Sequence, residues 1–371
     1  MKDLTHILHR VLGFSFVFLF LLPTSGRGQE SPAGPKPSAR KSPEAVSKDS
    51  KPFYEDWNTI TLERGSPHMQ TPELSDTGEI PNTGFIRERY MVSWRPGDPF
   101  DLYVIRPKGV AKPPVVLYLY TFPDDTELFK NNNWCENAVS GGYAAVGFVS
   151  ALTGHRLRYR LPKESFVTEM QEALAETTHD VQLILDYLAT RRDLDSTRVG
   201  MLGVGSGASI AILASAADQR IRAVDLLGPW GDWPGWLAHS KIIQEDLRAN
   251  FLKPEFLAKV APLEPITWLP KMKAKSVRIQ DVRNNMSMPD ESQEKLEAAA
   301  PDFALVNEYG NGRAFLKLQP PVFTFQWVKD QLRPDAKLTV AREKSERVHF
   351  FPAIQDQAGP GQSQAPVVNK Q

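Results

Sequence analysis

Short apolar runs that are typical of β-strands alternate with helical segments from about Phe85 to Leu332. Some of these runs, such as PPVVLYLYTF at 113–122, are continuously apolar, as expected of strands that are buried on both faces. Parallel strands need crossover helices between them, so this alternation predicts a mainly parallel central sheet flanked by helices. The sequence therefore indicates the α/β fold class.

Two segments depart from the alternation. Residues 85–94 and 98–107 flank the turn RPGD and predict an N-terminal antiparallel hairpin. A small Trp-rich helical insertion is expected at about 230–271, before the last strands. The other expected strands are 113–122, 143–151, 197–204, 221–229, 276–282 and 303–309, and the expected helices are 164–190, 207–217, 289–300 and 321–332.

The N-terminus, residues 1–28, has the features of a secretory signal peptide. Basic residues precede an apolar run at 11–23, and small residues follow it. The alternative is an uncleaved membrane anchor, but the run is short and ends at a proline, which favours the signal peptide. We predict an exported protein, periplasmic or extracellular, without a stable membrane anchor after signal cleavage.

Segments with few apolar residues flank the expected folded part. Residues 29–52 are rich in Pro, Ser, Ala and Lys and predict a disordered linker. Residues 352–371 have the same character and predict a disordered tail. A single domain is therefore expected over 53–351.

Composition and motifs argue against several classes of partner. The 44 basic and 44 acidic residues cancel, so no charge excess points to nucleic acid. No zinc, calcium or phosphate-binding motif occurs in the sequence, and GVGSGA at 203–208 has the spacing G-x-G-x-G, not that of a dinucleotide fingerprint. We expect no cofactor and no metal. The single cysteine, Cys135, excludes an internal disulfide.

Three segments carry a resemblance to a known superfamily. RVGMLGVGSGAS at 198–209 looks like the strand, sharp turn and helix around a nucleophile. SVRIQDVRNNMSMPDES at 276–292 looks like the strand and loop that carry the acid, and FALVNEYGNGRAF at 303–315 like the last strand and the loop that carries the base. Over about 85–332 the chain thus resembles the α/β-hydrolase superfamily, with exported esterases, dienelactone-hydrolase-like and peptidase-like members nearest in length and layout. The resemblance implies an α/β-hydrolase fold.

The nucleophile position of the resemblance is filled by glycine. The superfamily pattern G-x-S-x-G falls on residues 203–207, so Gly205 stands where the serine is expected. Glycine suits the strained turn but has no atom that can attack a carbonyl. Ser206 is the alternative nucleophile, but its position favours a residue that begins the following helix.

The acid position is filled by an amide. Counting back from Met288 and Pro289, which resemble the Val-Pro that often follows the catalytic Asp, leads to Asn285. An amide is neutral and cannot stabilise an imidazolium. Asp281 and Asp290 flank this position and are the alternatives if the frame is shifted.

The base position is also filled by an amide. The stretch YGNG at 309–312 stands where the superfamily has Gly-His-Gly, so Asn311 replaces the histidine. No amide acts as a general base. His155, after the strand at 143–151, is the better replacement base, whereas His349 lies beyond the last expected helix and favours a packing role.

The oxyanion segment and the insertion supply the candidate ligand-binding residues. Tyr120 and Thr121 stand where many members have His-Gly, which restricts how closely backbone N–H groups approach an oxyanion. The insertion could cover the site as a lid, with its tryptophans lining a cleft, or the tryptophans could anchor the insertion by packing. The candidate ligand-binding residues are Tyr120, Thr121, Ser206, Trp230, Trp233 and Trp236.

Joint replacement at Gly205, Asn285 and Asn311 predicts a catalytically inactive pseudo-hydrolase that retains a cleft for a small-molecule or peptide ligand. The alternative is an active serine hydrolase of carboxylic esters or peptide bonds, with the non-standard residues Ser206, His155 and Asp281. A third class is a structural envelope component whose linker and tail make its contacts.

Overall fold

The computed structural model of the chain describes residues 55–63, 67–79, 83–121, 127–152, 156, 167–318, 326–336, 346–350 and 369–370. The predicted signal peptide and linker lie outside these residues. The predicted tail also lies outside them, except for Asn369–Lys370, which pair with a neighbouring strand. Within the described ranges, no helix is both long enough and apolar enough to cross a membrane.

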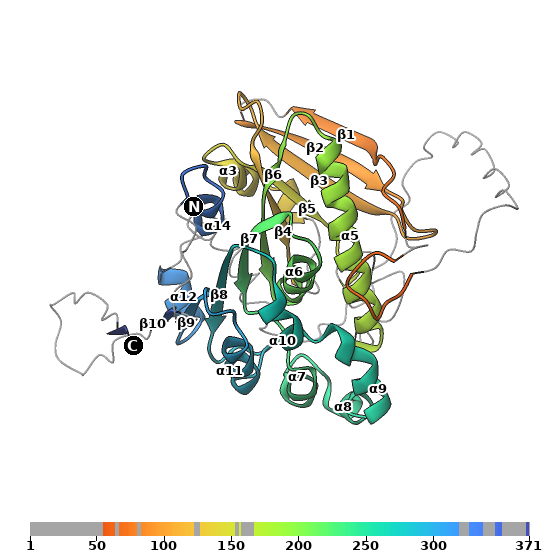
Figure 1. Ribbon diagram of the computed structural model, residues 1–371, viewed down its shortest axis with the longest axis vertical. Coiled ribbons are helices and arrows are strands. Elements are labelled where there is room, and N and C mark those ends of the chain that lie inside the picture. The colour runs from red at the N-terminus through yellow and green to blue at the C-terminus, as the bar shows by residue number, and fades with distance from the viewer. Residues whose placement is uncertain are drawn as a thin grey trace, which may run out of the picture.

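A single twisted sheet runs through the molecule, and its described strands follow the order β1-β2-β3-β5-β4-β6-β7-β8-β9-β10-β11 (Figure 1). In this order, each neighbouring pair from β5 to β10 is parallel. At the other end of the sheet, β1, β2, β3 and β5 pair in antiparallel orientation. The strands are β1 Glu73–Glu79, β2 Phe85–Val92, β3 Phe100–Pro107, β4 Pro114–Leu119, β5 Ala144–Phe148, β6 Asp195–Val204, β7 Ile221–Leu227, β8 Ser276–Val282, β9 Leu305–Tyr309, β10 Glu346–Phe350 and β11 Asn369–Lys370.

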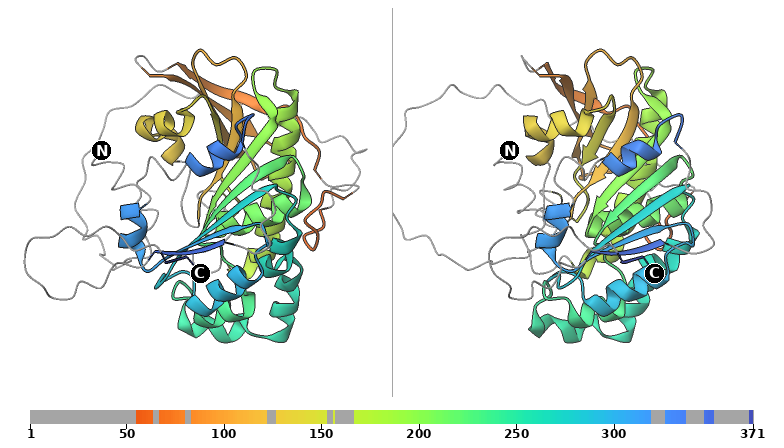
Figure 2. Two further views of the ribbon diagram at one scale, coloured as in Figure 1. Left: turned by 60° about the vertical axis from the view of Figure 1, so that its left-hand side comes forward. Right: turned by 90° about the vertical axis from the view of Figure 1, so that its left-hand side faces the viewer.

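Helices cover both faces of the sheet (Figure 2). One face packs against α5, α6, α10 and α11, and the other against α3, α12 and α14. The helices outside the insertion are α2 Glu127–Lys130, α3 Asn132–Val139, α5 Met170–Thr190, α6 Ser206–Ala217, α11 Asp290–Ala298, α12 Gly312–Leu318 and α14 Gln326–Gln331. This arrangement confirms the predicted α/β class with a mainly parallel sheet.

The insertion lies between β7 and β8 at the lower end of the molecule in Figure 1. It consists of α7 Trp233–His239, α8 Glu245–Phe251, α9 Pro254–Val260, η2 Ala261–Leu263, α10 Pro265–Trp268 and η3 Leu269–Lys271. The expected small helical insertion before the last strands is therefore present.

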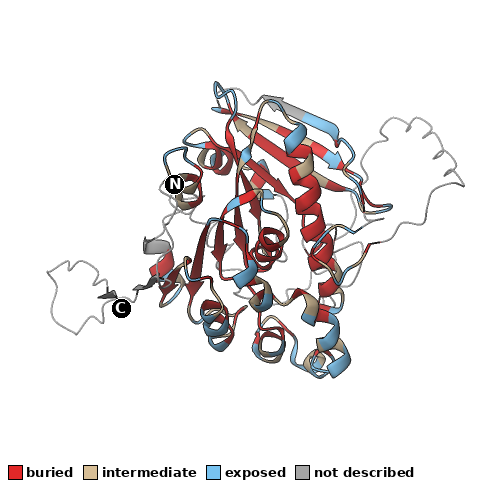
Figure 3. Cartoon of the chain, viewed as in Figure 1, coloured by how far each residue is buried: buried red, intermediate tan, exposed pale blue. Residues whose placement is uncertain are grey.

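The core follows the period of two that strands impose on their side chains. On β6, Val199 and Met201 face one apolar cluster, and Leu202 and Val204 face the other. The central strands and the helices α5 and α6 are buried almost throughout (Figure 3). A strand covered on both faces has no polar side, which explains the continuous apolar runs in the sequence.

The predicted elements agree with the structure in order and differ at a few boundaries. The opening hairpin is present as β2 and β3. The described part of the helix expected at 164–190 begins as α-helix at Met170. Three strands were not expected. They are β1 before the hairpin, β10, which extends the sheet beyond β9 in parallel, and β11, which pairs with β10 in antiparallel orientation.

Candidate functional site

The loops that follow the neighbouring parallel strands β4, β6, β7, β8 and β9 meet at one edge of the sheet. Gly205, after β6, donates its backbone N–H to the carbonyl of Leu227 on β7 at 2.9 Å. Gly228, after β7, donates in the same way to Gln280 on β8 at 2.9 Å. In open α/β sheets this carboxyl edge is where ligands bind. The three positions singled out by the resemblance therefore share the edge at which a hydrolase site would be built.

The turn after β6 has the geometry of a nucleophile elbow. Gly205 has φ 55° and ψ −117°, a conformation that side-chain-bearing residues rarely adopt. The flanking glycines are required by close packing: an added Cβ at Gly203 would be 2.5 Å from Ala208 Cα, and one at Gly207 would be 2.7 Å from the carbonyl carbon of Leu119. The glycine pattern thus lets α6 start directly against β6 and β4.

Thr121 occupies the space in which the side chain of a nucleophile would begin. A Cβ added at Gly205 would collide with Thr121 Oγ1 and would lie 2.8 Å from Thr121 Cβ. The same Cβ would be 3.3 Å from Trp230 Nε1. Distances below 3 Å between carbon atoms are strongly repulsive, so this structure leaves no room for a side chain at position 205.

Ser206, the alternative nucleophile, is the first residue of α6 and is fully buried. Ser206 therefore begins the helix, as the sequence predicted. A substrate carbonyl would need to reach this side chain through the packed junction of β6 and α6. The burial of Ser206 therefore disfavours a direct attack on a bound substrate.

Asn285, at the acid position, holds the loop after β8 in shape. Its Oδ1 accepts hydrogen bonds from Ser287 N at 2.9 Å and from Ser287 Oγ at 2.8 Å. This is an Asx turn, in which a side-chain carbonyl takes the place of a backbone one. Its Nδ2 points towards Gly228 and would lie 3.8 Å from a Cβ built there. Asn285 thus lies beside the loop after β7 and carries no charge.

The two acidic residues that flank Asn285 have structural partners. Asp290, at the start of α11, accepts a hydrogen bond from the backbone N–H of Asn284 at 3.1 Å. Asp281, on β8, is fully buried and lies beside Glu297. Burial, followed by the neighbouring carboxylate of Glu297, raises the pKa of Asp281 well above its ordinary value. A carboxyl group whose surroundings disfavour the charged form is poorly suited to orient a histidine.

Asn311, at the base position, is exposed and caps a helix. Its Oδ1 accepts a hydrogen bond from Ala314 N at 3.0 Å, which satisfies one free N–H at the start of α12. The loop is joined to the acid loop, because Asn284 Nδ2 donates to the carbonyl of Gly310 at 3.5 Å. His155 and the side chain of His349 lie outside the described residues.

Tyr120, at the oxyanion segment, packs against the apolar cluster that contains Phe129 and Trp134. Its hydroxyl accepts a hydrogen bond from Trp134 Nε1 at 2.8 Å, and its ring contacts Trp134 and Phe129. Thr121, the next residue, faces the elbow. Of the six candidate ligand-binding residues, these two are half-buried, and the others are buried.

The tryptophans of the insertion pack against one another. Trp230 stacks on Trp236 with ring centroids 5.0 Å apart, and Trp233 meets Trp236 edge-on at 5.7 Å. Trp233 Nε1 donates to the carbonyl of Leu263 at 3.2 Å, and Trp236 Nε1 to that of Ser287 at 2.8 Å. The tryptophans therefore fix the insertion to the sheet edge and to the acid loop.

Two features of the site were not evident in the sequence. The first is the collision between Thr121 and position 205, which depends on how two segments far apart in the chain approach each other. The second is Glu264, whose carboxylate accepts hydrogen bonds from the backbone N–H groups of Asp232 at 2.8 Å and Trp233 at 2.6 Å. The pair Glu264-Pro265 in the sequence indicates only the start of α10, where Glu264 also accepts a hydrogen bond from Ile266 N at 3.3 Å, and not these contacts to the start of α7. Among the described residues, no group of His, Cys, Asp and Glu side chains is arranged to hold a metal ion.

The strand order, the elbow after β6, and the loops after β8 and β9 define an α/β-hydrolase fold. Two solved structures support this assignment. The chain is similar to acetyl xylan esterase 1 from Thermoanaerobacterium sp. JW/SL YS485, with a TM-score of 0.51 and 14% identity over 68% of this chain and 88% of that one. It is also similar to a 2,6-dihydroxy-pseudo-oxynicotine hydrolase, with a TM-score of 0.51 and 18% identity over 70% of this chain and 71% of that one.

Comparison with known sequences adds little to this fold assignment. No family model matches the chain. The protein YcjY of Escherichia coli (strain K12) is 38% identical over 47 residues, which are 13% of this chain and 15% of YcjY. The expected α/β-hydrolase resemblance is thus confirmed at the level of the fold.

Proposed function

We propose that this chain is an exported α/β-hydrolase-fold protein that lacks serine-hydrolase catalysis and retains a binding cleft for a small-molecule or peptide ligand. The observation that carries the proposal is the contact between positions 121 and 205. Gly205 offers no nucleophile, and Thr121 fills the space that one would need. Catalysis would therefore require a change at Thr121 as well as a serine at position 205.

The acid and base positions support the same proposal. Asn285 and Asn311 each use the side-chain carbonyl in a local hydrogen bond that shapes a turn or caps a helix. Neither amide can take a proton from a nucleophile or stabilise a protonated histidine. The two loops therefore keep their structural roles without the chemistry of a triad.

Export rests on the sequence of residues 1–28 and ligand binding on the position of the site. The apolar run that follows basic residues supports cleavage and release from the membrane. The carboxyl edge of a parallel sheet, with an insertion beside it, is where α/β proteins bind ligands. Both remain proposals that experiments on the mature chain can test.

The decisive test is covalent labelling of the mature protein with a broad serine-reactive phosphonate. We expect no labelling of the wild-type chain, because the elbow carries glycine where an activated hydroxyl would stand. Stoichiometric labelling would reject the proposal. Loss of that labelling in Ser206→Ala would then assign the activity to Ser206, whereas labelling that persists would point to another nucleophile.

A reconstructed triad provides the positive control. The variant combines Gly205→Ser, Asn285→Asp and Asn311→His with Thr121→Gly, which makes room for the serine. Labelling of this variant, but not of the one that retains Thr121, would support the assignment of all the positions. Thermal-shift screening of the wild-type chain against esters, peptides and sugars tests the retained cleft, because a ligand that binds the folded state raises Tm.

A further inference from the structure

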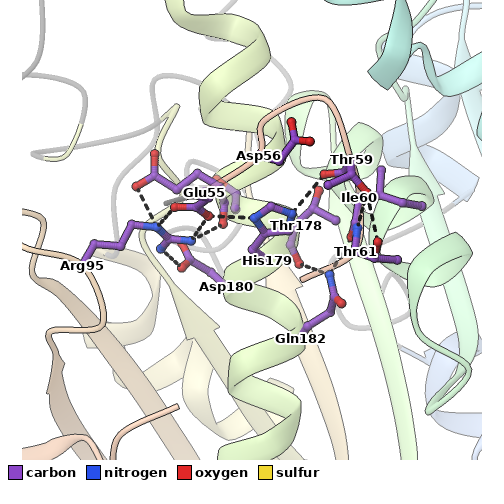
Figure 4. Close-up of polar contacts among 12 residues, drawn as sticks. Glu55, Asp56, Thr59, Ile60, Thr61, Arg95, Thr178, His179, Asp180 and Gln182 are labelled. Atoms are coloured by element: carbon purple, nitrogen blue, oxygen red, sulfur yellow. Dashed lines mark hydrogen bonds and ion pairs between the residues drawn. The ribbon is translucent and has the colours of Figure 1, made fainter. Parts of the chain in front are cut away.

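The segment Glu55–Glu63, here called the strap, lies along α5, and none of its hydrogen bonds with other described residues involves the candidate site residues (Figure 4). In the sequence, the strap begins three residues after the end of the predicted linker, 29–52. Ile60, in the middle of the strap, is 3% exposed and belongs to the main apolar cluster. The strap is therefore docked by burial of at least one apolar side chain, and its polar contacts decide how firmly it is held.

Three side chains of α5 bind backbone carbonyls of the strap. Gln171 Nε2 donates to the carbonyl of Trp57 at 2.8 Å, and Gln182 Nε2 donates to that of Ile60 at 2.7 Å. Between them, His179 Nε2 lies 3.0 Å from the carbonyl oxygen of Thr59. These contacts lie along one side of the helix, as Figure 4 shows for His179 and Gln182.

The carboxylate of Glu55 anchors the beginning of the strap. It accepts two hydrogen bonds from Arg95, one from Nε and one from Nη2, both at 2.6 Å. Its Oε1 also lies 2.7 Å from His179 Nδ1. Burial alone would raise the pKa of Glu55, but the hydrogen bonds and charges of Arg95 and His179 lower it to about 2. Glu55 is therefore ionised at any physiological pH.

Both ring nitrogens of His179 face oxygen atoms that can only accept hydrogen bonds. Nδ1 faces the ionised carboxylate of Glu55, and Nε2 faces the carbonyl of Thr59. A neutral imidazole carries one N–H and would turn a lone pair towards one of these oxygens. The ring is fully buried, so water cannot relieve that contact. Only the doubly protonated imidazolium can donate to both oxygens at once.

The charges around His179 favour a cation at this position. The carboxylates come from the strap, from the turn between β2 and β3, and from α5. Two guanidinium groups face them, from that same turn and from the chain after β5. The carboxylates are Glu55, Asp98, Glu176 and Asp180, and the guanidinium groups are Arg95 and Arg156. Negative charge exceeds positive charge in this buried cluster, and an imidazolium reduces the excess.

We propose that the strap is a pH-released latch, which the imidazolium of His179 holds closed on α5 and which opens when His179 loses a proton. The latch does not depend on the proposed function, because it lies outside the candidate site. Deprotonation leaves either Glu55 or Thr59 facing a lone pair in the protein interior. The closed strap then has one hydrogen bond fewer to α5, although Arg95 still donates to both oxygens of Glu55. The balance shifts towards the open strap, whose backbone carbonyls bind water.

A single thiol placed in the strap can report its opening. In Ile60→Cys the new thiol is buried while the strap is closed and reacts with iodoacetamide when it opens. The native Cys135 is buried, and burial raises its pKa to about 11, so it serves as an internal reference for global unfolding. Alkylation rates are divided by the rate of a free thiol peptide at the same pH, because the thiolate is the reactive form.

We expect the normalised alkylation rate of the thiol introduced at position 60 to rise by about tenfold or more as the pH is raised through the range in which the rest of the domain stays folded, because loss of one charged hydrogen bond favours the open strap by about that factor. Cys135 should stay protected throughout. In His179→Gln the strap should be open at every pH, so the rate is high and independent of pH. Gln182→Leu removes the hydrogen bond to the carbonyl of Ile60, which does not depend on pH. In this variant the alkylation rate should be higher at every pH, and its change with pH should match that of the parent protein.

A normalised rate that stays flat across this range in the parent protein would overturn the proposal, whatever the variants do. So would a parallel rise at Cys135, since that indicates unfolding of the whole domain. If His179→Gln fails to fold, Glu55→Gln removes the other half of the pair. A pH dependence of strap opening that is unchanged in Glu55→Gln would also overturn the latch.

Discussion

The side chain of Thr121 lies where the Cβ of any residue at position 205 other than glycine would have to stand. Thr121 follows β4, and Gly205 forms the turn after β6, so the two positions are far apart in the sequence and touch across adjacent parallel strands. The residues at positions 121 and 205 are therefore sterically linked. A side chain can be placed at position 205 only if residue 121 is made smaller or moves, whereas Thr121→Gly needs no change at position 205.

The first prediction concerns the free energy of unfolding of Gly205→Ala. The added methyl group meets Thr121 and also forces alanine into a positive φ, so we expect a loss of about 2–4 kcal/mol. Gly97→Ala is a matched control, because Gly97 also has a positive φ, of 75°, and a Cβ there would meet nothing within 4 Å. Urea unfolding should show a clearly smaller loss for the control.

A double-mutant cycle isolates the contact itself. Gly205→Ala should cost less in the background Thr121→Gly, with a coupling free energy of about 1–2 kcal/mol. Thr121→Ala is not sufficient, because the Cβ of residue 121 would remain too close. Strict additivity of the two substitutions would show that the strain lies in the backbone of the turn alone.

Much of the fold was predictable because burial on both faces leaves a clear pattern in the sequence. The segments that became β4, β5 and β8 are short and almost continuously apolar or bounded by turns. Their alternation with helical segments predicted the α/β class with a mainly parallel sheet. The strand β1 was missed because its sequence, ELSDTGE, has no apolar period, and its residues Glu73–Asp76 are exposed in the structure. An edge strand with charged side chains is stabilised by pairing with β2, which no local pattern reveals.

The candidate site was predictable in position but not in packing. Motif spacing located the turns after β6, β8 and β9, because glycines are needed where a helix begins directly against a strand. The role of Thr121 was not predictable, since it depends on how β4 and β6 approach each other in space. The strap was missed for the same reason: Glu55 and His179 are separated by 124 residues along the chain.

The second prediction concerns the pH dependence of stability through Asp281. Burial and the neighbouring Glu297 raise its pKa in the folded state, so the folded chain keeps a proton that the unfolded chain releases. This contribution is therefore fully present below the ordinary carboxyl pKa and is lost as the pH rises above it. We expect wild-type stability to fall relative to Asp281→Asn above about pH 4, by at most about 1.4 kcal/mol per pH unit.

Urea unfolding at a series of pH values measures this difference. Asp76→Asn is the control, because Asp76 lies exposed on β1, and its stability curve should run parallel to that of the wild type. A curve for Asp281→Asn that also runs parallel to the wild type would contradict the buried, protonated state of Asp281.

The third prediction concerns Lys329, a buried lysine on α14. Its Nζ donates to the carbonyls of Asn137 at 2.8 Å and Ser140 at 3.0 Å, at the end of α3. Burial lowers its pKa to about 8 from the ordinary 10.5. Between these two values the unfolded chain binds more protons than the folded chain, so stability from this group rises with pH.

Lys329→Met should remove that rise. The difference in unfolding free energy between wild type and variant should grow from about pH 8 to about pH 10.5, by at most about 1.4 kcal/mol per pH unit. Denaturant unfolding over this range measures it. A constant difference would show that the ammonium group is solvated in the folded chain.

The fourth prediction concerns the buried ion pair between Asp225 on β7 and Arg278 on β8. Arg278 donates to both carboxylate oxygens, from Nε at 3.0 Å and from Nη2 at 2.6 Å, and Gln280 adds a third hydrogen bond at 3.0 Å. Asp225→Ala leaves the guanidinium unpaired in the core, so we expect a loss of about 3–5 kcal/mol in the free energy of unfolding.

An exposed pair provides the comparison for this loss. Asp186→Ala breaks the half-exposed pair with Arg220, whose atoms are 2.7 Å apart, and should cost less than about 1 kcal/mol. The double variant Asp225→Leu and Arg278→Met should recover most of the stability lost in Asp225→Ala, because it removes the stranded charge as well as its partner. The double variant separates two possible causes of the loss, the unpaired guanidinium and the packing between β7 and β8. If it were as unstable as Asp225→Ala, the loss would come from packing and not from the unpaired guanidinium.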